Sequence, residues 1–168
     1  LLDLQKLTHR KTIAQLQAEA EAAARPAPTD FEKKDALRRY QHGELLRIGA
    51  SDFLGLYDFR AVISQISRLA IGLTRAGLSL AARQSGIPAD GFVVLAMGKL
   101  GGRELNYSSD IDLLFIARDS AINYLPLAQK LIDNLASTTP EGFLYRVDTR
   151  LRPWGKDGPL VPNLAGYM

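Results

Sequence analysis

The chain has 168 residues, of which 46% are hydrophobic and 23% are charged, and its formal net charge is +3. This composition is typical of a globular protein that buries a core without cross-links, and the absence of cysteine excludes disulfides and thiolate metal sites. No apolar run approaches the ~20 residues that span a bilayer, and the N-terminus lacks a signal-peptide pattern. The absence of cysteine agrees with a cytoplasmic protein, which we expect.

The first half of the chain is predicted to begin with two helices. Residues 1–24 combine loosely spaced leucines with an alanine-rich stretch, which predicts one helix that Pro26 breaks. Thr29 and Glu32 have the spacing of a capping box, so a second helix is expected to begin there. Glycines in the region 49–55 are expected to end this helix.

A third helix is expected after Asp58, whose side chain suits an N-cap. Apolar residues then recur at three- and four-residue steps and form the clearest helical stripe in the chain. They are Val62, Ile63, Ile66, Leu69, Ala70, Leu73 and Leu80. Gly86 and Pro88 are expected to end this helix, so residues 1–88 are predicted to be a helical region.

The second half of the chain changes period and predicts strands. Residues 92–97 are a short, continuous apolar run, which is typical of a strand covered on both faces. Residues 111–117 predict a second strand, and leucines at every fourth position predict a helix over residues 125–135. Residues 143–151 alternate in polarity and predict a third strand. We therefore expect an α+β fold in which the helical region packs on a small mixed sheet.

Carboxylates are concentrated at the predicted strands. Asp110 and Asp112 are two residues apart, so in a strand their side chains point to the same face. Adjacent carboxylates repel each other unless a cation lies between them, and hard oxygen ligands suit Mg²⁺ or Mn²⁺. Asp148, on the polar face of the third predicted strand, supplies another carboxylate. Such a set can hold two ions that stabilise the attacking and leaving oxygens at phosphorus.

Glycines and basic residues flank these carboxylates. Backbone amides of the turn at residues 98–102 can approach phosphate oxygens, because glycine leaves room for them. Arg150, Arg152 and Lys156 follow Asp148 and can neutralise further phosphate charge. Two plainer interpretations stay open. Asp148 could cap the turn that follows it, and the two arginines could form the exposed face of an edge strand.

The spacing of these residues resembles a known superfamily. Gly98-Lys99, ten further residues and then Asp110-Ile111-Asp112 match the pattern of the DNA polymerase β nucleotidyltransferase superfamily. Lys99 stands where that pattern more often has serine.

Two longer segments resemble a particular family. GKLGGRELNYSSDIDLLF (98–115) and YRVDTRLRPWGKDGPLV (145–161) are similar to the two signature segments of glutamine synthetase adenylyltransferase, the bifunctional glutamate–ammonia-ligase adenylyltransferase/adenylyl-removing enzyme. The resemblance covers roughly residues 44–161, and the first 25 residues show no comparable match. The connection between Ala117 and Tyr124 is shorter than is usual in the family.

The resemblance implies a polymerase β-like core over residues 89–168, incomplete at its C-terminus, in a piece of a longer protein. Family members carry one domain that removes AMP from a tyrosine of glutamine synthetase by phosphorolysis, giving ADP, and another that attaches AMP from ATP. Leu105-Asn106-Tyr107-Ser108-Ser109 resembles the removing domain, because the attaching domain tends to carry glycines within this stretch. The PII signalling protein is a further partner implied for the full-length enzyme.

The resemblance also implies the site residues. Asp110, Asp112 and Asp148 would be the catalytic carboxylates and would bind two Mg²⁺ or Mn²⁺ ions. The residues implied to contact phosphate or nucleotide are Gly98, Lys99, Gly101, Gly102, Arg103, Ser109, Arg150 and Arg152. Three other functions stay open: the ATP-using domain of the same enzyme, a related nucleotidyltransferase acting on RNA or a small molecule, and a non-catalytic regulatory domain. We expect neither nucleic acid nor a membrane as a partner.

Overall fold

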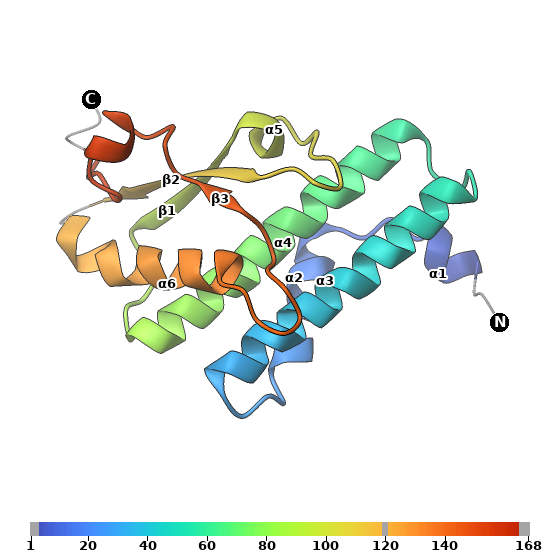
Figure 1. Cartoon of the computed structure of the whole chain (residues 1–168), viewed down its shortest axis with the longest axis horizontal. Coiled ribbons are helices and arrows are strands. Elements are labelled where there is room, and N and C mark those ends of the chain that lie inside the picture. Colours follow the sequence, from blue (N-terminus) through green and yellow to red (C-terminus); the bar gives the residue numbers. More distant parts are fainter. Residues whose placement is uncertain (1–3, 119–120, 165–168) are drawn as a thin grey trace.

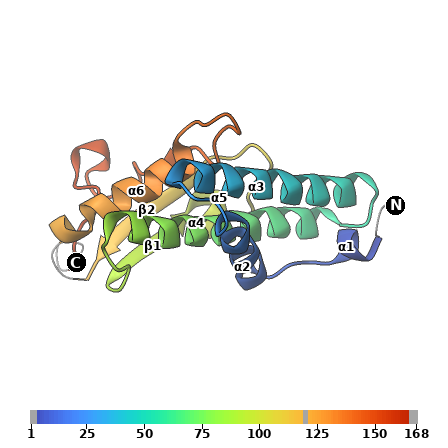
Figure 2. The ribbon, with the colours of Figure 1, turned by 90° about the horizontal axis from the view of Figure 1, so that it is seen from below.

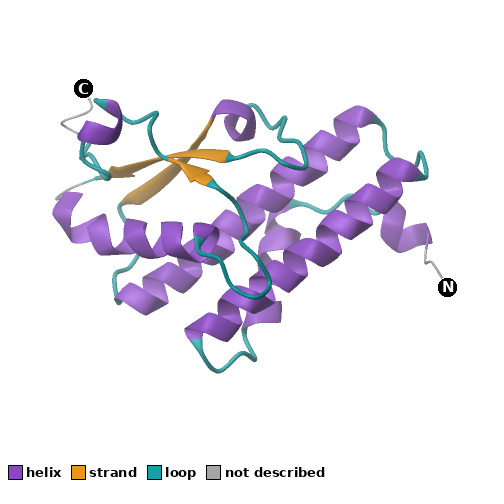
Figure 3. Cartoon of the chain, in the orientation of Figure 1, coloured by secondary structure: helices purple, strands orange, loops and turns teal. Residues whose placement is uncertain are grey.

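Helices and a small sheet form an α+β architecture in the computed structural model, which describes residues 4–118 and 121–164 (Figure 1 and Figure 3). The elements are α1 (Leu4–Thr8), α2 (Ile13–Ala24), α3 (Asp30–Phe53), α4 (Phe59–Ser85), β1 (Phe92–Met97), α5 (Gly98–Gly101), β2 (Ile111–Ala117), η1 (Ala121–Tyr124), α6 (Leu125–Ala136), β3 (Val147–Asp148) and η2 (Gly155–Asp157). α3 and α4 run side by side along the molecule (Figure 2). The predicted fold class is confirmed. The short connection noted before Tyr124 contains residues 119–120, which lie outside the described residues.

The predicted caps of the long helices are confirmed. The Thr29 side chain accepts a hydrogen bond from the backbone N–H of Glu32, and the Glu32 side chain accepts one from the backbone N–H of Thr29. Asp58 Oδ1 accepts a bond of 2.6 Å from the backbone N–H of Ala61 at the start of α4. Gly86 ends α4 with a φ of +68°, in the left-handed region that glycine adopts readily.

The single helix predicted over residues 1–24 is wrong, because the chain divides there into α1 and α2. Thr12 begins α2 with a second capping box, in which its partner is Gln15. The side-chain amide of Gln65 in α4 binds both backbone groups of Lys11 at 3.0 Å. These bonds satisfy the backbone without a helix, so alanine-rich composition did not decide the conformation between α1 and α2.

The sheet has the order β1-β2-β3, with β1 and β2 antiparallel and β2 and β3 parallel. The mixed sheet is therefore confirmed, but the prediction that β1 is covered on both faces is wrong. Val93 and Leu95 are 48% and 40% exposed, so one face of β1 is open. A continuous apolar run did not distinguish a two-sided strand from an edge strand with exposed apolar residues.

The third strand is much shorter than the predicted range of residues 143–151. Leu144 and Tyr145 are consecutive and both buried, which breaks the alternation of a strand. Both of their backbone N–H groups donate to the Leu135 carbonyl at 3.0 Å, at the end of α6. The segment is thus tied to a helix terminus, and only Val147 and Asp148 form a strand.

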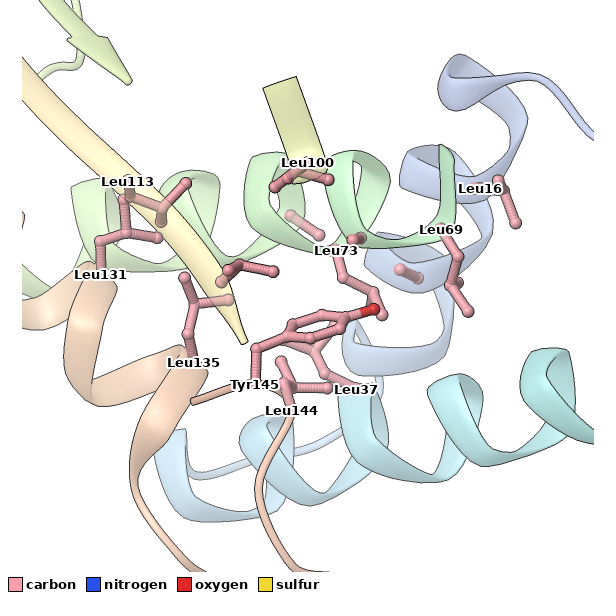
Figure 4. Close-up of a cluster of buried hydrophobic side chains, with 14 of the residues drawn as sticks. Leu16, Leu37, Leu69, Leu73, Leu100, Leu113, Leu131, Leu135, Leu144 and Tyr145 are labelled. Carbon is pink, nitrogen blue, oxygen red and sulfur yellow. The ribbon is translucent and has the colours of Figure 1, made fainter. Parts of the chain in front are cut away.

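One hydrophobic cluster joins the helices to the sheet (Figure 4). Leu131 and Leu135 of α6 lie against Gly77 of α4, where a Cβ would stand 3.4 Å from Leu135. This cluster contains residues from both sides of the division expected at residues 88/89. The domain boundary itself stays a prediction. None of the described helices is long and apolar enough to cross a membrane.

A network of buried and partly buried charges links the N-terminal segments to α3. Lys11 Nζ lies 2.5 Å from Glu19 Oε2 and 2.6 Å from Glu44 Oε1, and Arg47 Nε donates to Glu44 Oε2 at 3.0 Å. Burial acts against ionisation of Glu19, but hydrogen bonds from Lys11 and Tyr40 outweigh it and hold the pKa of Glu19 below its ordinary value. The charges in this network are therefore mutually compensated.

Replacement of Lys11 by methionine is expected to lower the free energy of unfolding by about 2 kcal/mol. Methionine keeps the apolar stem but leaves the Glu44 carboxylate, which is 8% exposed, with Arg47 as its one charged partner among the described residues. Lys33→Met is the matched control, because the pair that Lys33 makes with the exposed Asp30 is long, at 3.6 Å. Urea denaturation of both variants measures the difference, and equal midpoints would contradict a stabilising role for the network.

Candidate functional site

The pairing of β2 with β3 brings the predicted carboxylates to one edge of the sheet. Asp112 and Asp148 are partners in the parallel ladder, and paired residues of neighbouring strands project to the same face. Asp110 directly precedes Ile111, whose own partner is Val147. The three aspartates that the sequence singled out therefore lie close together at the N-terminal end of β2.

Arginines pair with two of these carboxylates. Arg146 Nε donates to Asp110 Oδ1 at 2.5 Å, and Arg150 Nη2 donates to Asp148 Oδ2 at 2.5 Å. The backbone N–H of Arg150 also donates to Asp148 Oδ1 at 2.8 Å, so Asp148 does cap the turn that follows it. Hydrogen bonds from Arg150 hold the pKa of Asp148 below its usual value, and the carboxylate raises the pKa of Arg150 in return.

A polar cleft of 390 Å³ opens beside Asp110 and Asp112. Lys99 and Arg146 bring positive charge to its wall, opposite in sign to the two aspartates. Asn106, Ser108 and Ser109 complete the lining. A wall with charges of both signs suits a ligand that carries phosphate and a bound cation together.

Gly98 is required by close packing against a site carboxylate. Met97 pairs with Asp112 across β1 and β2, so the chain turns away from the sheet right beside that side chain. Gly98 has a φ of +51°, and a Cβ at this position would overlap the Asp112 carboxylate. Both the backbone angle and the space therefore demand glycine here.

The predicted phosphate-binding residues divide into two groups. Lys99 and Ser109 line the cleft. Gly101 instead allows close packing inside the protein, because a Cβ there would stand 2.6 Å from the Ala96 carbonyl oxygen. A Cβ on Gly102 would lie 3.1 Å from Glu104 Oε1. For the glycines of this turn, the observed neighbours are protein atoms, and contact with phosphate stays a prediction.

The predicted arginines are placed outside the lining of the cleft in the described part of the chain. Arg103 follows α5 with a left-handed φ of +57°. Arg150 is engaged by Asp148, and its side chain is 77% exposed. Arg152 donates to the carbonyls of Thr149, Lys156 and Gly158 at 2.8–3.1 Å and so closes the turn around η2. A phosphate contact by any of these three arginines stays a prediction.

The cleft contains functional candidates that the sequence reasoning missed, above all Arg146. Its guanidinium binds Asp110 and also donates to the Ser108 carbonyl at 3.2 Å. A signal for it was present, because Arg146 lies two residues before Asp148 and falls on the same face of a strand. Asn106 and Ser108 had no comparable signal, since they lie in the loop before β2.

The helical region positions the segment that carries Arg146 and Asp148. Arg38 of α3 is fully buried, and it donates to the Gly142 carbonyl at 2.7 Å and to the Ser137 carbonyl at 2.5 Å. Gln41, one turn further, donates to the Leu144 carbonyl at 2.6 Å. In Figure 1 this segment crosses α3 before it rises into β3. Hydrogen bonds from one helix therefore fix the approach to the carboxylate edge.

The three aspartates are the right kind of ligand for a hard divalent cation, but their side chains do not converge on one point. Carboxylates at one sheet edge are the ligands that Mg²⁺ or Mn²⁺ prefers. Within residues 4–118 and 121–164, no three Asp, Glu, His or Cys side chains are grouped closely enough to hold a metal ion. Arg146 and Arg150 would have to release Asp110 and Asp148 before these could turn toward shared ions. The metal ligands therefore stay a prediction.

The helix-rich chain with a three-stranded mixed sheet is consistent with an α+β nucleotidyltransferase-like fold. The family described as glutamate-ammonia ligase adenylyltransferase matches residues 1–168. The chain belongs to this family. The match includes the first 25 residues, for which the sequence motifs had indicated no relationship.

Three relatives named bifunctional glutamine synthetase adenylyltransferase/adenylyl-removing enzyme illustrate the similarity. The protein from Chromobacterium violaceum is 36% identical over 99% of this chain and 20% of its own length. The protein from Methylococcus capsulatus is 42% identical over 74% of this chain and 15% of its own length. The protein from Shewanella loihica is 37% identical over 79% of this chain and 16% of its own length. The chain thus spans about a fifth or less of the curated relatives it matches.

Proposed function

We propose that the chain is the core of a metal-dependent nucleotidyltransferase domain that removes AMP from a tyrosine of glutamine synthetase. The observation that carries the proposal is that Asp110 and Asp112 line one cleft and that Asp148 pairs with Asp112 in the sheet, in a chain of this family. The names of the relatives combine the attachment and the removal of AMP in one protein. The resemblance of residues 105–109 to the removing domain favours removal.

The proposed reaction is phosphorolysis. An oxygen of inorganic phosphate bonds to the α-phosphorus of the AMP–tyrosine linkage, the bond to the tyrosine oxygen breaks, and that oxygen takes up a proton, so ADP and free tyrosine result. Mg²⁺ or Mn²⁺ would supply positive charge to the attacking and leaving oxygens. Asp110, Asp112 and Asp148 would hold the ions, and Lys99 and Ser109 would contact phosphate from the cleft wall.

The partners follow from the same proposal. Adenylylated glutamine synthetase is the substrate, and phosphate and ADP enter and leave through the polar cleft. The PII signalling protein is proposed as a partner of the longer enzyme rather than of this cleft.

The proposal is tested by the fate of labelled phosphate. The chain is incubated with adenylylated glutamine synthetase, Mg²⁺ or Mn²⁺ and ³²P-phosphate, and we expect the label to appear in ADP as AMP leaves the tyrosine. Omission of the metal is expected to stop the release. Incorporation of AMP from ATP into unmodified glutamine synthetase, without release from the adenylylated form, would instead identify the attaching domain. Saturable metal binding without either reaction would contradict both activities.

A further inference from the structure

A second cavity opens directly beside the carboxylate cleft. It has a volume of 280 Å³ and lies between α3, α4 and the segments that lead into β2 and β3. Asn106, Ser108, Ser109 and Arg146 line both cavities. A ligand with its charged end in the cleft can therefore extend past this shared wall into the second cavity.

The second cavity differs from the cleft in chemistry. Leu45 of α3, Ile66 of α4 and the buried Leu144 give it an apolar surface, whereas the cleft is walled by charged and amide groups. Phe143 and Tyr107 also line it, and they are 42% and 47% exposed. Exposed aromatic rings beside an apolar surface are suited to stack on a flat ring system.

Polar groups in the same wall have hydrogen-bonding capacity to spare. Asn106 Oδ1 accepts from Ser109 Oγ, so the Asn106 amide nitrogen keeps its donors, and it has no acceptor among the described residues. His42 likewise has no hydrogen-bonding partner in the described part of the chain, and its imidazole can both donate and accept. A few such groups on an apolar wall fix the orientation of a heterocyclic ligand.

We propose that this second cavity binds the adenine base of the nucleotide whose phosphate lies in the carboxylate cleft, an inference that rests on the proposed function. The other ring in an AMP–tyrosine linkage is the tyrosyl ring, whose oxygen is esterified, so it offers only C–H edges. Adenine carries ring nitrogens and an amino group that match His42 and Asn106. Arg146, at the shared wall, lies where the sugar-phosphate would pass between the cavities.

Binding of ADP and of pyrophosphate to the 168-residue chain, measured by calorimetry in the presence of Mg²⁺, tests the adenine site. Pyrophosphate has the charged groups of ADP without the base. Phe143→Ala is expected to weaken ADP binding about tenfold, within the range for stacking of a base on an aromatic side chain, and to leave pyrophosphate binding unchanged. His42→Ala is expected to act in the same direction. Phe53→Ala is the matched control, because Phe53 is 91% exposed and does not line the cavity.

Several outcomes overturn the adenine site. One is an unchanged affinity of Phe143→Ala for ADP, and another is an equal loss of affinity for ADP and for pyrophosphate. A third is a raised KM for adenylylated glutamine synthetase with unchanged ADP affinity, which would place the tyrosyl ring in the cavity. The labelled-phosphate assay separates the two proposals. Phosphorolysis with ADP affinity independent of Phe143 refutes the adenine site alone. Phe143-dependent ADP binding without AMP release refutes the proposed function and supports the adenine site.

Discussion

Replacement of Asp112 by asparagine is expected to lower the rate of metal-dependent AMP release by about a thousandfold. Asparagine keeps the shape of the side chain but removes the charge, and loss of one ion's stabilisation of the transition state costs about 4 kcal/mol, where each 1.36 kcal/mol is a factor of ten in rate. Asp110→Asn is expected to have an effect of the same order. The measurement is the initial rate of ADP formation from labelled phosphate, with Mn²⁺ binding measured in parallel.

Stability measurements separate a chemical effect from a loss of fold. Asp110 and Arg146 are 53% and 63% exposed, and such pairs contribute about 1 kcal/mol or less, so Asp110→Asn is expected to unfold cooperatively near the wild-type temperature. Asp112→Asn keeps the shape of its side chain and is expected to do the same. Asp90→Asn is the matched control, because this aspartate is 88% exposed and lies outside the cleft. Full activity in Asp112→Asn would refute the assignment of the carboxylates, whereas loss of activity in Asp90→Asn would point to an indirect effect.

The helices were predictable because their signals are local. Thr29 and Asp58 begin α3 and α4 through bonds to residues three positions away, and Gly86 ends α4 through its own backbone angle. The break before α2 was not predictable in the same way, because it depends on Gln65, which is 54 residues distant from Lys11. A partner that far along the chain leaves no periodic pattern around Lys11.

The strands show the same division between local and distant causes. The bounds of β1 follow from an apolar run that ends at Gly98, and those of β2 from an apolar run that ends before Arg118. The structure has both strands where they were predicted. The segment before β3 alternates in polarity, yet Leu144 and Tyr145 are both held by α6, and Arg38 holds Gly142 from α3. Tertiary contacts therefore replaced most of the predicted strand.

The candidate site was predictable to the extent that it depends on strand geometry. The two-residue spacing of Asp110 and Asp112 indicated a shared face, and pairing in the sheet adds Asp148 to the same edge. The same spacing places Arg146 on the face of Asp148, and Arg146 contacts Asp110, although it was not among the predicted site residues. The second cavity was beyond prediction, because its walls come from four segments that only the folded chain brings together.

Replacement of Gly98 by alanine is expected to reduce AMP release about as strongly as Asp112→Asn, although it alters no charge. A Cβ at position 98 would overlap the Asp112 carboxylate, so that carboxylate must rotate away from the cleft. The loss of a metal ligand would again cost about 4 kcal/mol in the transition state. The φ of +51° adds strain of about 1–2 kcal/mol to the folded state, which denaturation would detect.

Gly86→Ala isolates the contact from the strain. Gly86 has a φ of +68°, but a Cβ there would meet nothing within 4 Å, so this variant carries the backbone cost without the overlap. We expect both variants to lose similar stability and only Gly98→Ala to lose Mn²⁺ binding and phosphorolysis. Equal activity in the two variants would mean that Asp112 tolerates displacement, which would argue against its role as a metal ligand. If only Gly98→Ala loses Mn²⁺ binding and phosphorolysis, the overlap of its methyl group with Asp112, rather than backbone strain, is the cause of the lost activity.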